Sequence, residues 1–178
     1  MVPPDEDRGG ADDAPTTADD DRGDVGDTPT TTGDRLLADA MLGTLTTYLR
    51  MCGYDAAYAP DRGAEADDEV LALAAREDRR IVTRDRQLAA RAPGSVLVGS
   101  RAVLDQLREL RDAGFEIALA DRPTRCGRCN GPLRPTETTT LPEYVSDDAE
   151  EVWRCAECGQ FFWRGSHWDD VRRRLDDL

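Results

Sequence analysis

Short apolar runs alternate with helically spaced apolar residues from position 36 to about 120. The apolar run 36–38 predicts a strand, and Asp39 ends it. Apolar residues at helical spacing follow, so a helix with one buried face is predicted next: Met41, Leu42, Leu45, Tyr48, Leu49 and Cys52. Gly53 stands where a left-handed helix cap is expected. Ligands of open α/β sheets bind at the carboxyl ends of the strands, so Asp39 is a candidate for chemistry.

The same alternation predicts the rest of this domain. Further strands are expected at residues 55–59, 80–83, 96–98 and 115–119, with helices after Asp67, around 87–91 and over 103–110, the last closed near Gly114. Strands that alternate with helices predict an α/β fold, here a small and mostly parallel sheet with helices on both faces. We assign residues 35–120 to this domain.

The last third of the chain contains two C-x-x-C pairs. They are formed by Cys126 with Cys129 and by Cys155 with Cys158. Four thiolates close a tetrahedral zinc sphere and leave no open position for catalysis, so the spacing predicts a structural zinc site. Two redox or disulfide pairs are the alternative, which is disfavoured in a chain without a secretion signal or a thioredoxin-like context. The fifth cysteine, Cys52, is interpreted as a small core residue.

Aromatic and apolar residues around the cysteines predict a zinc ribbon and a terminal helix over residues 121–178. Ribbon strands are expected at 138–144 and 152–153. Ser166 with Asp169 fits a capping box, and the helix that follows would bury Trp168, Val171, Leu175 and Leu178 while carrying Arg172, Arg173 and Arg174. The aromatic residues 161–163 either stack on unpaired bases or form the ribbon's own core. The single histidine is interpreted as structural rather than as an acid/base catalyst.

Charge adds two expectations. All 23 basic residues are arginine and the net charge is -14, which would argue against a polyanionic partner. Adaptation to molar salt, where charges are screened, is the interpretation we favour, so we expect a halophilic protein. Residues 1–34 hold 11 acids and 2 arginines and predict a disordered acidic tail. Without an apolar run of membrane-spanning length or a signal peptide, we expect a cytoplasmic protein with no membrane partner.

Acids fall at the ends of the predicted strands. Asp39 follows the first strand, Asp85 follows the third, and Asp67 or Asp68 opens the helix between them. Right-handed crossovers place the carboxyl ends of parallel strands on one edge, where these carboxylates are candidate ligands for Mg²⁺ or Mn²⁺. Taken singly, each acid is also explained as a helix cap or a turn residue. A phospho-receiver domain uses acids on the same edge, but it usually adds a lysine, and this chain has none.

The order of these motifs resembles the Mut7-C RNase family, in which a PIN-type nuclease domain is fused to a zinc ribbon. The resemblance covers the chain from residue 36 to its end. The matching residues are 37–43, Leu49, Arg50, 53–55, 67–69, Arg79, 83–85, Arg125 with the two cysteine pairs, Asn130, Gly131 and 163–168.

The resemblance implies a metal-dependent ribonuclease that cleaves RNA phosphodiesters with metal-activated water. It implies Asp39, Asp67 and Asp85 as catalytic ligands of Mg²⁺ or Mn²⁺. Contacts with the substrate are implied for Arg84, Arg50 and Thr83, with Thr83 orienting a metal ligand and Arg84 meeting a phosphate.

The sequence departs from the family pattern at two places. Arg86 and Gln87 stand where many PIN domains have a fourth acid, and Thr44 replaces a usual basic residue. RNA is the implied partner, with homodimer formation and association with tRNA or the ribosome as further expectations. A non-catalytic RNA- or ribosome-associated binding module on the same PIN-like fold is the alternative function.

Overall fold

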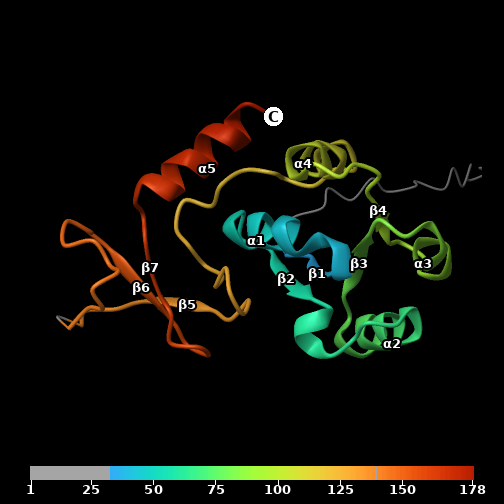
Figure 1. Ribbon diagram of the computed structural model, residues 1–178, viewed down its shortest axis with the longest axis horizontal. Coiled ribbons are helices and arrows are strands. Elements are labelled where there is room, and N and C mark those ends of the chain that lie inside the picture. The colour runs from blue at the N-terminus through green and yellow to red at the C-terminus, as the bar shows by residue number, and fades with distance from the viewer. Residues whose placement is uncertain (1–32, 139) are drawn as a thin grey trace, which may run out of the picture.

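A computed structural model describes residues 33–138 and 140–178 of the chain (Figure 1). Residues 1–32, to which the predicted disordered tail belongs, lie outside the described residues. The elements, in chain order, are β1 (Arg35–Ala38), the 3-10 helix η1 (Ala40–Leu42), α1 (Gly43–Met51), β2 (Asp55–Tyr58), η2 (Pro60–Arg62), α2 (Asp67–Glu77), β3 (Arg80–Thr83), α3 (Arg86–Arg91), β4 (Val96–Leu97), α4 (Val103–Asp112), β5 (Leu133–Pro135), β6 (Val152–Cys155), β7 (Phe161–Trp163) and α5 (Ser166–Asp176). None of these helices is both long enough and apolar enough to cross a membrane.

Four parallel strands form the first sheet, in the order β2-β1-β3-β4. The central strand β1 pairs on both sides, with Leu37 beside Ala57 of β2 and Ile81 of β3. Side chains of strands that are covered on both faces are apolar without interruption, which explains the run 36–38. The predicted α/β fold with a parallel sheet is confirmed.

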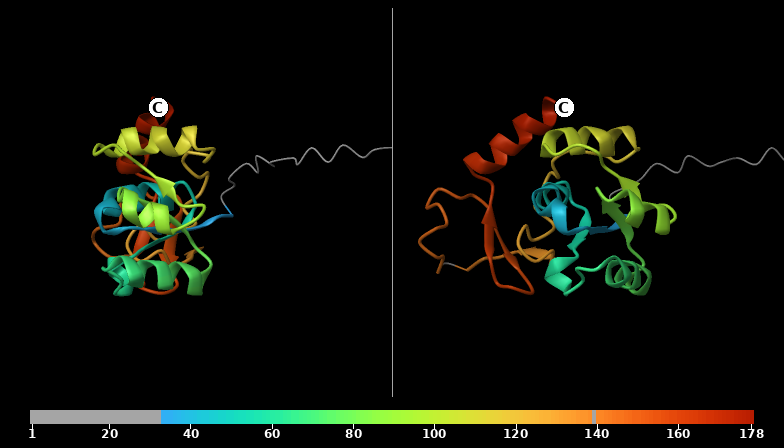
Figure 2. Two further views of the ribbon diagram at one scale, coloured as in Figure 1. Left: turned by 90° about the vertical axis from the view of Figure 1, so that its right-hand side faces the viewer. Right: turned by 45° about the vertical axis from the view of Figure 1, so that its right-hand side comes forward.

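Helices cover both faces of this sheet. Successive strand residues point to opposite sides, so one strand contributes apolar side chains to the cores on both faces. Leu36 and Ala38 pack in a core with α1 and α4, whereas Leu37 and Ile81 pack against α2 and α3. Figure 2 shows α4 and α2 on opposite sides of the strands. The terminal helix α5 adds its apolar face to the first of these cores, next to α1 and α4.

The strand predicted at residues 115–119 is not formed. Phe115 and Ile117 are buried in the core nonetheless. The Tyr54 hydroxyl accepts a hydrogen bond from the Glu116 N–H and donates one to its carbonyl, at 3.0 and 3.2 Å. The alternation of apolar residues therefore corresponds to a buried segment that forms no strand: Phe115 makes only an isolated bridge, and the Glu116 backbone is bound by the Tyr54 side chain.

The second sheet is an antiparallel ribbon of β5, β6 and β7. The strand predicted at 138–144 is wrong, since no strand is assigned to 138 or 140–144 and β5 instead spans Leu133–Pro135. Its register places Leu133 opposite Cys155 and Pro135 opposite Trp153. Threonine favours strands, but which residues pair depends on the register of the two strands. In this ribbon the residues that pair lie close to the cysteines, and the threonine-rich segment lies beyond them.

The predicted capping box of the last helix is also wrong. Ser166 is the first residue of α5, and Gly165 is the N-cap, without a side-chain hydrogen bond. A Cβ atom at Gly165 would lie 2.9 Å from the indole Nε1 of Trp163, so glycine is required there by the close approach of the ring. The predicted buried face of α5 is confirmed, because Trp168, Val171 and Leu175 are buried.

Candidate functional site

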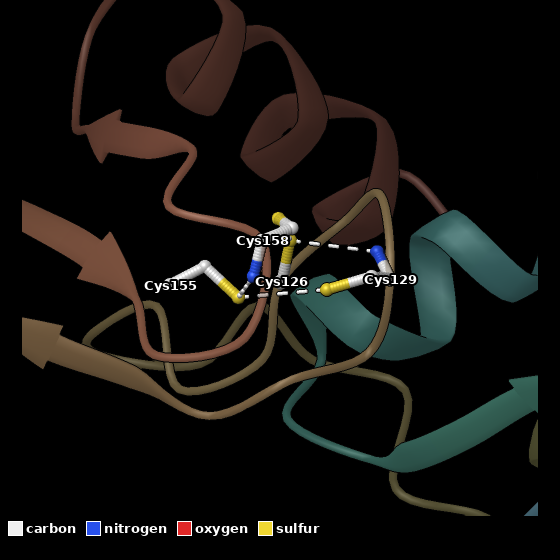
Figure 3. A group of neighbouring side chains, drawn as sticks. All are labelled: Cys126, Cys129, Cys155 and Cys158. Carbon is white, nitrogen blue, oxygen red and sulfur yellow. Dashed lines mark hydrogen bonds between the residues drawn. The ribbon is translucent and has the colours of Figure 1, made fainter.

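Four cysteine thiols meet between two turns of the ribbon (Figure 3). Their Sγ atoms all lie within 4.8 Å of one another, with 3.7 Å between Cys126 and Cys158 and 3.5 Å between Cys129 and Cys155. A tetrahedron of Zn–S bonds about 2.3 Å long has S···S edges of about 3.8 Å. The arrangement therefore fits the structural zinc ion that the sequence predicts.

Backbone N–H groups donate hydrogen bonds to two of these sulfur atoms. The N–H groups of Cys129 and Cys158 each donate to the first sulfur of their own pair, both at 3.5 Å. Burial raises the pKa of Cys126 and of Cys129. Burial also opposes ionisation of Cys155, but backbone hydrogen bonds prevail and lower its pKa to about 7. Because thiolates are the ligands, zinc binding releases protons and weakens in acid.

Arg50 joins the first cysteine turn to the parallel sheet. Its side chain is 4% exposed, and its Nε donates to the Ala56 carbonyl at 2.8 Å. One terminal nitrogen donates to the carbonyls of Gly127 and Arg128, at 2.9 and 3.2 Å. These donors are occupied by backbone, so the geometry favours a structural role for Arg50 over the substrate contact that the resemblance implies.

A second joint between ribbon and sheet is built around Asp55. Asn130, in the left-handed region with φ 68°, accepts from the Ala56 N–H at 3.1 Å and donates to Asp55 at 2.6 Å. Arg79 donates to the same carboxylate at 2.7 Å. Asp55 begins β2, so this joint lies at the amino edge of the sheet, opposite Asp39. The sequence showed Asp55, Arg79 and Asn130 only as family residues, and no local pattern predicted that they meet.

At the carboxyl edge, Thr83 connects two of the candidate acids. Its hydroxyl donates to the Asp39 carboxylate at 2.8 Å and accepts from the Asp85 N–H at 2.9 Å. Thr83 is fully buried and Asp39 is 9% exposed. The adjacent parallel strands β1 and β3 bring these residues together, as the crossover rule predicts.

Both acids also serve as helix caps. Oδ1 of Asp39 accepts from the Ala40 N–H at 2.6 Å. Oδ1 of Asp85 accepts from the N–H groups of Gln87 and Leu88, at 2.6 and 3.2 Å. The structure therefore shows both acids as helix caps, and it also places both of them at the ends of strands.

Asp67 is held apart from these two acids. It lies in the first turn of α2 with its side chain 41% exposed, 3.5 Å from Arg91, which also pairs with Asp68. Within residues 33–138 and 140–178, the four cysteines form the one group of three or more side chains close enough to share an ion. In the structure Asp39 and Asp85 are therefore both bound to Thr83, whereas Asp67 is paired with Arg91.

Arg84 lies between Thr83 and Asp85 at the same edge. Its Nε is buried and has no hydrogen-bond partner among the described residues. Nearby, Glu109 of α4 binds the hydroxyl and N–H of Ser100. Partial burial raises the pKa of Glu109, but these hydrogen bonds and, more weakly, the Arg84 charge lower it overall. A guanidinium with an unused donor thus stands beside Asp85.

Together, the fold and the thiolate site define an α/β protein with an attached zinc-ribbon module. The model of the Mut7-C RNAse domain matches residues 34–175, and the chain belongs to this family. Comparison with curated proteins and comparison with solved structures each gave no match. The match spans both sheets, which confirms the resemblance found in the sequence. Family membership indicates an RNase-type function, with RNA as substrate or partner.

Proposed function

We propose that the protein is a divalent-metal-dependent ribonuclease that hydrolyses RNA phosphodiester bonds at the carboxyl edge of its parallel sheet. The observation that supports it most is the Thr83 hydroxyl, which connects Asp39 and Asp85 at the ends of adjacent strands. Carboxylate oxygens suit Mg²⁺ or Mn²⁺, and such an ion supplies an activated water and neutralises charge on a phosphoryl group.

Each residue at this edge has a distinct role in the proposal. Asp39 and Asp85 would hold the ion, and Thr83 fixes the orientation of Asp39. Arg84 would bring the positive charge of its guanidinium to a phosphate oxygen. Asp67 would complete the site once a metal or substrate draws it from Arg91, with which it is paired at 3.5 Å.

The zinc ribbon would bind the RNA backbone. Arg134 and Arg154 stand directly opposite each other on β5 and β6, where like charges are destabilising. Neither is paired with an acid in the part of the chain that the structure describes. In a chain of net charge -14, two adjacent uncompensated arginines support a polyanionic partner at this face.

Cleavage of a labelled single-stranded RNA tests the proposal. The zinc-loaded protein is assayed at high salt with Mn²⁺, with Mg²⁺ and with neither, beside Asp39→Asn, Asp85→Asn and a control, Asp112→Asn. Asparagine removes the charge and keeps the one oxygen that caps each helix. At position 39 its amide nitrogen replaces Oδ2, the oxygen that accepts from Thr83, so circular dichroism is used to verify that both variants fold. We expect ion-dependent cleavage by the wild type and the control, and its loss in both edge variants. Full activity in both edge variants would refute the proposal.

A non-catalytic RNA- or ribosome-associated module is the second candidate. It is favoured by the separation of Asp67 from the other acids and by the capping roles of Asp39 and Asp85. RNA binding without cleavage under either ion would select it. Homodimer formation, tRNA or ribosome association, salt adaptation and cytoplasmic location stay predictions from the sequence.

A further inference from the structure

An aromatic cavity of about 280 Å³ lies where the ribbon, α5 and α1 meet. The side chains that matter here are Phe161, Trp163, Trp168, Met51, Arg125 and His167. Phe161 and Trp163 are only half-buried, so this face of β7 is not closed by the ribbon's own core. A partly open aromatic cavity beside basic side chains is suited to a flat, polar ring.

We infer that this cavity binds one unpaired base of the RNA, an inference that rests on the proposed function. Aromatic side chains stack on bases of any sequence. Trp168, 6% exposed, lines the cavity, and its indole N–H is buried without an acceptor among the described residues. A base supplies both a ring for stacking and a carbonyl or ring nitrogen that can accept this hydrogen bond.

A second hollow extends from the cavity toward the acidic edge. It shares Thr47, Met51 and His167 with the cavity and runs along α1 to Gly43 and Thr44. Gly43 directly follows η1, the short helix capped by Asp39. From Gly43 to Met51, α1 rises about 12 Å at 1.5 Å per residue. A strand with one base in the cavity is therefore led along α1 to the proposed cleavage site, a few nucleotides away.

Positive charge accompanies this path. Arg125 lines the cavity, and Arg174 of α5 lines the hollow along α1, where its guanidinium donates to the Tyr48 hydroxyl at 3.3 Å. Arg125 is already paired with Asp55, at 3.7 Å, whereas Arg174 has no ion pair within the described residues. An uncharged apolar peptide would leave Arg174 without one, and a phosphate beside a bound base provides it. The charges and the connection to the acidic edge thus favour single-stranded RNA as the occupant.

A scan with abasic nucleotides tests the inference. Single-stranded RNAs, each lacking one base at a different position, are bound to the zinc-loaded Asp39→Asn protein, which prevents cleavage. The scan is repeated with Thr47→Phe added, which places bulk in both hollows, and with Thr138→Phe, an exposed control outside them. Zinc content and circular dichroism verify that the variants fold.

We expect one abasic position to weaken binding by about 5- to 150-fold, the range for loss of one stacked base. Thr47→Phe should weaken intact RNA and remove that position dependence, while Thr138→Phe should preserve it. A flat profile in the starting protein, or an unchanged profile in folded Thr47→Phe, would overturn the inference. Cleavage by the wild type with a flat profile rejects the cavity alone, whereas a position-specific profile without cleavage rejects the nuclease and retains the base site.

Discussion

The hydroxyl of Thr83 donates a 2.8 Å hydrogen bond to the carboxylate of Asp39, forty-four residues earlier in the chain. The contact exists because β1 and β3 are adjacent and parallel, so that both residues lie at the carboxyl edge of the sheet. The same hydroxyl accepts from the Asp85 N–H. One buried side chain thereby sets the orientation of one proposed metal ligand and the turn that carries the other.

Thr83→Val should lower the cleavage rate more than RNA affinity. Valine keeps the shape but leaves Asp39 and the Asp85 N–H without their partner. Loss of such a supporting hydrogen bond typically costs 10- to 100-fold in activity, and the unfolding free energy should fall by about 1–3 kcal/mol. Single-turnover cleavage and equilibrium binding measure the two effects. Thr83→Ser restores the hydroxyl and should recover the rate; wild-type activity in Thr83→Val would contradict the assigned role.

Asp55→Asn should destabilise the joint between ribbon and sheet in a pH-dependent manner. Burial raises the pKa of Asp55, but Arg79 and Asn130 lower it below the ordinary value of 3.8. The folded state therefore binds this proton less tightly than the unfolded state, and the charge stabilises folding above about pH 4. Loss of these charged hydrogen bonds should cost about 1–3 kcal/mol near neutral pH.

Urea unfolding over a range of pH measures this effect. The difference between the wild type and Asp55→Asn should shrink as pH falls through the folded pKa, because the wild-type carboxylate is then protonated as well. Asp112→Asn, an exposed change on α4, should follow the wild type throughout. A difference that is independent of pH would show that the charge of Asp55 does not hold the joint.

Zinc removal should unfold the ribbon and weaken RNA binding. The turns that carry the cysteines also place Gly127 and Asn130 against the parallel sheet, so loss of the metal releases those contacts. Metal analysis should find one Zn²⁺ per chain, and tryptophan fluorescence should report unfolding after chelation. Cys52→Ala is the control, since Cys52 is 2% exposed in the core and burial raises its pKa to about 12. Unchanged fluorescence and RNA affinity without zinc would contradict the structural role.

Replacement of both Arg134 and Arg154 by glutamine should reduce the salt dependence of RNA binding. Each phosphate contact to a single strand contributes about 0.7 to the slope of log affinity against log salt, so the slope should fall by about 1.4. Removing the like-charge pair stabilises the ribbon slightly, while loss of the Arg154 contacts with the Gly159 carbonyl and the Phe161 ring acts in the opposite direction. An unaltered slope would place the RNA elsewhere.

The control for this measurement replaces two paired arginines. Arg76 and Arg108 are exposed and each lies near an acid on its own helix, Glu77 and Asp105 respectively. Because α2 and α4, which carry these arginines, belong to the other sheet and not to the ribbon, Arg76→Gln with Arg108→Gln should leave the slope close to that of the wild type.

Features that depend on near neighbours were predictable from the sequence. The run 36–38, the helical spacing after Asp39 and the two cysteine pairs each describe local geometry, and the structure confirms the strand, the helix and the clustering of the thiols. Met41 is the exception on the predicted buried face, since it lies in η1 and is 57% exposed. The positive φ of Gly53 follows in the same way, because a left-handed cap is a local requirement.

Features that depend on distant partners were not predictable. The segment 115–119 alternates like a strand, yet its backbone is bound by Tyr54. Arg50 has the charge of a substrate contact, yet it is buried against the first cysteine turn and donates to the Gly127 carbonyl. The placement of Asp39 and Asp85 at one edge of the sheet followed from topology, whereas the pairing of Asp67 with Arg91 depends on how α2 and α3 pack. Residue type alone does not distinguish these outcomes.

Binding of Mn²⁺ in the absence of RNA tests the proposed acidic site most directly. Electron paramagnetic resonance of free Mn²⁺ is used to titrate the zinc-loaded wild type, Asp39→Asn and Asp112→Asn, which carry the same acidic background apart from one charge. We expect the wild type and Asp112→Asn to take up one more Mn²⁺ with measurable affinity than Asp39→Asn. Identical titrations of all three proteins would contradict a metal site at the carboxyl edge of the sheet.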